Sequence, residues 1–100
     1  MTYKAIIENM IKAKAIEKVE AQLDDTTYRF STGEIKTIEN NNEIFPAKDF
    51  MVQVTTTTKE WAEREFEAHG WINEYGFISI SIIWEITYDK GYRSSEIFYQ

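Results

Sequence analysis

The segment that most constrains the fold is "FISISIIWEITY", residues 77–88. From position 78 to position 88 every even-numbered residue is apolar, whereas the odd-numbered positions include two serines, a glutamate and a threonine. Because successive side chains of a strand point to opposite faces of a sheet, this period of two predicts a half-buried β-strand. The following Asp89-Lys90-Gly91 predicts a short hairpin connection, with Gly91 at the positive φ of a bulge-type turn, and "YRSSEIFY" predicts the returning strand.

The composition extends this expectation to the whole chain. Isoleucine occurs 14 times and leucine once, and there are ten threonines. β-Branched side chains suit a pleated surface and lose rotamer freedom in helices, so this bias favours a sheet-dominated fold. At 100 residues and 43% hydrophobic content, with no apolar run long enough to cross a bilayer, the chain is expected to form one globular domain, residues 1–100.

Further strands are predicted in both halves of the chain. In "FMVQVTTT" (50–57), Phe50, Val52 and Val54 alternate with more polar positions. The segments "TYRFS" and "EIKTIE" also predict extended structure, with Gly33 at a bulge or bend between them. The run 40–42 of three asparagines predicts a turn, and a proline at position 46 keeps that connection from being a central strand.

The N-terminal segment predicts a helix from about Tyr3 to Lys14, because apolar residues recur there at helical spacing. The next stretch, "EKVEAQL" (17–23), can continue the helix or alternate as a strand. The strand is the preferred interpretation, because Asp24 and Asp25 would then supply the turn that follows it.

A second helix is predicted over residues 58–69. Thr57 and Glu60 fit a capping box, and Gly70 stands where a left-handed residue would stop the helix. A period of 3.6 residues would place acidic side chains on one arc and apolar ones on the other. Glu65 and His69, four residues apart, would then be in reach of each other.

Together these elements predict an α+β fold. It comprises an antiparallel sheet of about four to six strands, with an N-terminal helix and a second short acidic helix packed on one face. The side chains expected on that covered face are Val52, Val54, Ile80, Ile82 and Trp84.

The distribution of charge along the chain favours some classes of partner over others. The net charge is −6, and residues 24–100 carry 14 acidic and seven basic side chains, whereas residues 1–23 are net +1. An acidic body repels nucleic acid and anionic membranes, so neither is expected as a direct partner. The partner that this charge favours is a basic protein surface.

The leading functional hypothesis is therefore a small acidic, non-enzymatic interaction protein whose partner-binding residues are Glu60, Glu63 and Glu67. In its most concrete form it is a phage or mobile-element inhibitor that occupies the nucleic-acid-binding surface of a host enzyme. The composition, rich in isoleucine and in lysine over arginine, is typical of a low-GC bacterium or its phage.

Two alternatives stay open. One is a small-ligand binding or sequestering protein, or a small enzyme, with a pocket between sheet and helix near Glu65, His69 and Trp61. The other is a homodimer or larger assembly built through an edge strand, for which Ile97 and Tyr99 on one face of the last strand are the interface candidates.

Several chemistries find no support in the sequence. There is no cysteine, only one histidine and no glycine-rich phosphate loop, so no catalytic residue, metal site or cofactor is predicted. The N-terminus has no apolar signal core, so a cytoplasmic location is expected.

Overall fold

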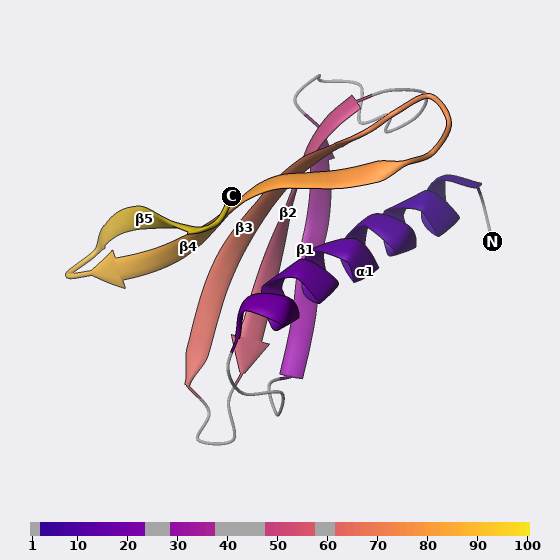
Figure 1. The fold of residues 1–100 in the computed structure, drawn as a ribbon. Helices are drawn as coiled ribbons and strands as arrows, with labels where there is room; N and C mark the ends of the chain where they lie inside the picture. The colour runs from indigo at the N-terminus through magenta and orange to yellow at the C-terminus, as the bar shows by residue number, and fades with distance from the viewer. Residues whose placement is uncertain (1–2, 24–28, 38–47, 58–61) are drawn as a thin grey trace.

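The computed structural model describes residues 3–23, 29–37, 48–57 and 62–100. In these residues one helix precedes five strands: α1 (Tyr3–Gln22), β1 (Arg29–Thr37), β2 (Lys48–Thr57), β3 (Glu63–Ile72), β4 (Ile78–Asp89) and β5 (Tyr92–Tyr99). The strands form one antiparallel sheet in the order β1-β2-β3-β4-β5, and α1 lies across one of its faces (Figure 1). The predicted α+β arrangement is confirmed for the N-terminal helix and the antiparallel sheet.

The core lies between α1 and the sheet. The helix buries side chains at three- and four-residue spacing, and the sheet buries alternate residues of its central strands. The core members are Ile7, Ile11, Ala15, Val19, Phe50, Val52, Val54, Phe66, Ala68, Ile72, Ile80 and Ile83. Since Val19 completes the buried row of a helix that runs to Gln22, the preferred strand over 17–23 is wrong, and continuation of the helix is correct.

The predicted acidic helix is also wrong over the residues that the structure describes. Residues 63–72 form β3, which pairs with β2 on one side and β4 on the other. Phe66 and Ala68 point into the core, so the intervening positions point to the other face. Thr57, the expected cap, pairs with Glu63 in the β2–β3 ladder. Residues 58–61 lie outside the described part of the chain.

Gly70 was expected to stop a helix, but it is a buried residue within β3. A Cβ atom at this position would lie 2.0 Å from the backbone oxygen of Ser79 and 2.9 Å from Cζ of Phe50. Only glycine lets β4 and the Phe50 ring approach this closely.

One extra residue in β4 redirects its side chains. Gly70 pairs with Ile80 and His69 pairs with Ile82, so Ser81 forms a β-bulge, and its hydroxyl donates a 3.1 Å hydrogen bond to the carbonyl oxygen of His69. Before the bulge Ile80 faces the helix; after it Ile83 does.

The bulge decides which predicted core residues face α1. Val52, Val54 and Ile80 lie on the helix-covered face, as predicted. For Ile82 and Trp84 that prediction is wrong, because they pair with His69 and Glu67 on the opposite face.

The remaining local predictions concern the β4–β5 hairpin and the bend in β1. Asp89 pairs with Tyr92 across a two-residue loop in which Lys90 has φ 52° and Gly91 has φ 86°. Positive φ at both positions is typical of a type I′ hairpin turn, so the hairpin and the φ of Gly91 are confirmed, while the bulge-type turn is not. The register of β1 shifts between positions 32 and 35, around the predicted bend at Gly33. Residues 40–42 and 46 lie outside the described segments.

Candidate binding face

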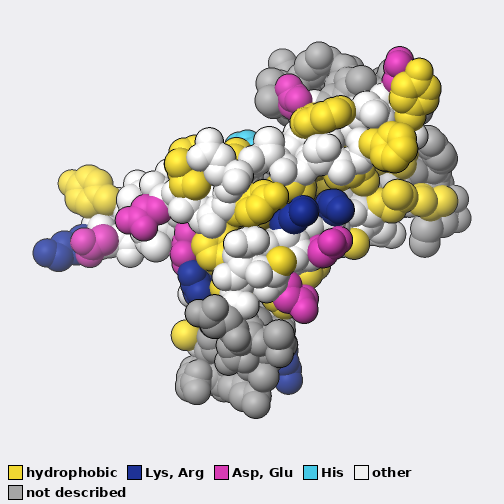
Figure 2. Space-filling model, viewed as in Figure 1, with side chains coloured by type: hydrophobic (Ala, Val, Ile, Leu, Met, Phe, Trp, Pro, Cys, Tyr) yellow, Lys and Arg dark blue, Asp and Glu magenta, His cyan; other side chains and the backbone are white. Residues whose placement is uncertain are grey.

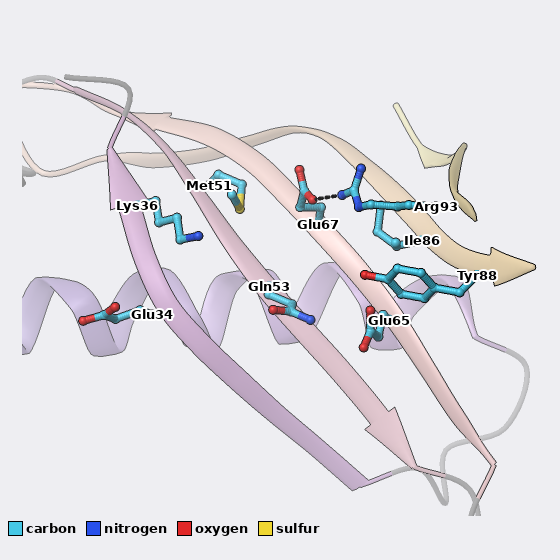
Figure 3. Close-up of a pocket in the computed structure, with 9 residues that line it drawn as sticks. All are labelled: Glu34, Lys36, Met51, Gln53, Glu65, Glu67, Ile86, Tyr88 and Arg93. Carbon is cyan, nitrogen blue, oxygen red and sulfur yellow. Dashed lines mark hydrogen bonds and ion pairs between the residues drawn. The ribbon is translucent and has the colours of Figure 1, made fainter. Parts of the chain in front are cut away.

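The sheet has one face that α1 does not cover, called the open face below. It carries the odd-numbered side chains of β2 and β3 and, after the bulge, the even-numbered side chains of β4. Figure 3 shows several of them projecting from the sheet, with α1 behind it. An antiparallel sheet can leave one face to water, and the residues on that face then decide what it binds.

Carboxylates line β3 on the open face. Glu63, Glu65 and Glu67, called the acidic row below, alternate with the inward-pointing residues Arg64 and Phe66. Because alternate residues of a strand are about 6.6 Å apart, the three carboxylates project in parallel at regular intervals. The acidic row therefore follows from the same alternation that buries Phe66.

Apolar side chains line the neighbouring strand. Ile82, Trp84, Ile86 and Tyr88 of β4, called the apolar row below, lie next to β3, with Trp84 opposite Glu67 and Ile86 opposite Glu65. Tyr88 is 63% exposed. Ile82 and Trp84 are half-buried, and Ile86 is buried where the Arg93 side chain reaches across β4 to Glu67. A sheet face that only meets water is normally polar, so apolar side chains on this face are unusual, although Tyr88 is the member of the row that is mainly exposed.

A hollow of about 230 Å³ opens on this face, and residues of all five strands line it (Figure 3). Its lining residues are Glu34, Lys36, Met51, Gln53, Glu65, Glu67, Ile86, Tyr88 and Arg93. At its edge Arg93 donates a hydrogen bond from Nη2 to Oε2 of Glu67, and Nε2 of His69 lies 3.0 Å from Oε1 of the same carboxylate. Glu67 is thus held by two side chains, whereas Glu65 makes no ion pair with any described residue.

On the helix side of the molecule, acidic and basic side chains lie close to each other, in contrast to the row of carboxylates on β3. Figure 2 shows cationic and anionic side chains interspersed along α1. Lys4 lies 3.9 Å from Glu8, and Lys14 lies 3.9 Å from Glu17. Two lysine–glutamate pairs therefore lie along α1, whereas Glu65 on the open face makes no ion pair with any described residue.

The predicted site residues are only partly brought together. Glu63 and Glu67 share the open face, as the acidic-face hypothesis requires, although on a strand; Glu60 and Trp61 lie outside the described residues. Glu65 and His69 share this face but are about 13 Å apart along β3, so their predicted contact is wrong. The hollow that includes Glu65 lies on the face opposite α1, and not between sheet and helix.

The two interface candidates on β5 do not share a face. Ile97 pairs with Trp84 and Tyr99 pairs with Ile83, so the register shift at Phe98 sends them to opposite faces. Ile97 is 55% exposed on the open face, whereas Tyr99 packs against the core. The expectation of a common face is wrong, and a role in self-association stays a prediction.

Sequence reasoning missed the apolar row and Arg93 as parts of a site. The available signal was the alternation of residues 63–72, in which Phe66, Ala68 and Ile72 follow a period of two that fits a strand as well as a helix. With β3 recognised as a strand, its carboxylates could have been assigned to one sheet face.

Other findings limit the chemistry of the described residues. They hold no group of three or more His, Cys, Asp or Glu side chains that could bind a metal ion. Their helix lacks the combination of length and apolar character that crossing a bilayer requires. No family model matches the chain, and comparisons with curated proteins and with solved structures return no match.

Proposed function

We propose that this chain is a small non-enzymatic interaction protein that binds a basic protein surface through the open face of its sheet. The observation that carries the proposal is the acidic row beside the apolar row on a face that α1 leaves uncovered. Protein interfaces combine apolar, often aromatic anchors with charged groups that select the partner.

The apolar row would supply the anchors of the interface, and the acidic row would select the partner. Burial of Trp84 and Tyr88 against a partner supplies the affinity, since Trp and Tyr are the side chains most enriched among dominant interface residues. Glu63 and Glu65 attract cationic side chains and speed association with a basic surface. Glu67 is already paired with Arg93, which holds it in place at the centre of the face.

The inhibitory form of the proposal follows from the kind of surface that the acidic row would fit. Proteins that bind nucleic acid present lysine and arginine to phosphates. Carboxylates repeated along one strand can occupy such a surface and exclude the nucleic acid. The proposed partner is therefore a nucleic-acid-handling protein of a low-GC bacterium.

The test compares two charge-reversed double variants in a pull-down from lysate of such a bacterium. Glu63→Lys/Glu65→Lys changes the acidic row, whereas Glu17→Lys/Glu20→Lys makes the same change in net charge on exposed positions of α1. A partner retained by the unmodified chain and by the helix variant, lost from the face variant and released by moderate salt would support the proposal. Equal retention by both variants would reject it.

A second candidate is a small-ligand binding protein, and the hollow between Glu65, Gln53 and Tyr88 is the observation that favours it. Its volume of about 230 Å³ suits a ligand smaller than most drug-sized molecules. A thermal-shift screen of small cationic compounds tests this candidate, with Glu65→Gln as the variant that should lose any hit. A hit that Glu65→Gln retains at full strength would argue against binding in the hollow.

A further inference from the structure

The last strand, β5, forms one edge of the sheet. Among the described strands only β4 pairs with it, and Figure 1 shows the hairpin of β4 and β5 projecting from the body of the molecule. Every residue from 92 to 97 is exposed. An edge strand presents a row of unpaired N–H and C=O groups, and these groups can pair with a further strand.

The hairpin turn determines which backbone groups of β5 point to the free edge. Asp89 and Tyr92 flank the two-residue turn and form the first hydrogen-bonded pair of the ladder. Because hydrogen-bonded and non-hydrogen-bonded pairs alternate along an antiparallel ladder, the backbone groups of Arg93, Ser95 and Ile97 point away from β4. These three alternate residues are therefore the ones that can bond to another strand.

The opposite edge of the sheet has protective features that β5 lacks. β1 contains a bulge between positions 32 and 35 and carries the charged side chains of Arg29, Glu34 and Lys36. Bulges and charges oppose pairing at an edge. β5 is regular from 92 to 97 and contains neither proline nor lysine, and its one cation, Arg93, is drawn across β4 to Glu67. The edge of β5 is therefore the one suited to pairing.

The sequence of β5 is complementary to a second copy of itself. A two-fold axis perpendicular to the sheet keeps each face on its own side, so paired residues must point to the same face. With Ser95 opposite Ser95 of the second copy, Arg93 lies opposite Ile97, and all three outward residues pair. A centre at residue 96 would place two Glu96 carboxylates opposite each other, and a centre at residue 94 would place Ile97 opposite Gly91 of the turn.

We propose that this chain forms a two-fold dimer in which the β5 strands of two copies pair antiparallel about Ser95 and join the two sheets into one. The three outward residues of each strand then form about six backbone hydrogen bonds between the copies. Ile97, which is 55% exposed in the single chain, packs against the aliphatic part of Arg93 of the second copy.

The dimer goes beyond the proposed function and does not depend on it. Pairing at β5 extends the sheet in its own plane, and β4 and β5 separate the acidic row from the new strand. The acidic row therefore stays uncovered in the dimer.

The experiment measures the dissociation constant of the dimer by sedimentation equilibrium of the full chain over a series of concentrations. Two lysine variants change the net charge equally. Ser95→Lys would place two lysines directly opposite each other, whereas Ser94→Lys would place each lysine opposite Glu96 of the second copy. Both positions are exposed in the single chain, so both variants should fold.

The unmodified chain is expected to sediment as a dimer. Ser95→Lys should raise the dissociation constant at least about tenfold, because the repulsion lies on the two-fold axis, and Ser94→Lys should raise it at most about twofold. Ser95→Pro should also raise it at least about tenfold, since proline removes N–H groups that bond only to the second copy. Urea unfolding checks that Ser95→Pro keeps the fold of the single chain.

Several outcomes would overturn the inference. They are a chain that stays monomeric at millimolar concentration, equal weakening by the two lysine variants, and a dimer that Trp84→Gln disrupts while Ser95→Lys does not. If Ser95→Pro does not fold, the two lysine variants decide the question. A monomeric chain that still captures a basic partner through the acidic row would reject the dimer and leave the proposed function standing.

Discussion

Replacing Ile83 with alanine is expected to cost far more folding free energy than the same change at its neighbour Ile82. The two residues are adjacent in β4, but the bulge at Ser81 places Ile83 against α1 and Ile82 on the open face. This pair of variants tests the register on which both the core and the apolar row depend.

The magnitude follows from burial. The side chain of Ile83 is 0% exposed, and its truncation to alanine removes three buried carbons, worth about 0.8 kcal/mol each. A residual cavity of about 50 Å³ would add about 1.2 kcal/mol at ~24 cal/mol per Å³. The expected loss is thus about 3.6 kcal/mol. Ile82 is partly exposed and leaves no enclosed cavity, so its truncation should cost about 1 kcal/mol.

Urea unfolding followed by circular dichroism measures both values by linear extrapolation, with similar m-values as the check for two-state behaviour. If Ile83→Ala does not fold, Ile83→Val should still cost about 1 kcal/mol. A loss at Ile82 equal to or larger than the loss at Ile83 would refute the reasoning. It would place the apolar row in the core and remove the basis for the open face.

Three further variants test other parts of the fold by the same unfolding assay. Gly70→Ala should destabilise the fold by about 3 kcal/mol or more because its Cβ would overlap the backbone of Ser79. Gly33→Ala, whose Cβ would have only ordinary contacts, should change the stability by less than about 1 kcal/mol. Equal effects would contradict the close approach of β4 to Gly70. Glu85→Gln should cost about 1 kcal/mol, less at high salt, because Arg64 donates two hydrogen bonds of 2.8 Å to this half-buried carboxylate; no change would mean that solvent screens the pair. Lys90→Asn should stabilise by about 0.5 kcal/mol because asparagine tolerates the positive φ of the type I′ turn better, and a loss would argue for another turn.

Local patterns were sufficient for several elements. The strands over 50–57, 78–88 and 92–99 and the hairpin at Lys90-Gly91 agree with the structure, since alternation and turn chemistry act between neighbours in sequence. Residues 63–69, predicted as part of a helix, were assigned wrongly because Glu, Ala and Arg favour helices and capping signals precede them. Pairing with β2 and β4, which depends on distant residues, overrode that preference.

The candidate site, too, could be predicted from the sequence only in part. The acidic charge, and the presence of Glu63 and Glu67 on one surface, could be predicted from the sequence, although through the wrong element. The neighbours of these carboxylates on the open face, Trp84, Tyr88 and Arg93, could not, because they come from strands whose register was unknown.

The sequence by itself determined that this chain is β-rich, acidic and begins with a helix. Only the tertiary structure decided which residues face the helix. The even-numbered apolar positions from 78 to 88 form one uninterrupted pattern, yet the bulge at Ser81 divides them between the two faces of the sheet. One extra residue reverses the direction of every side chain that follows it, and the close packing that sets its position involves Gly70 on another strand.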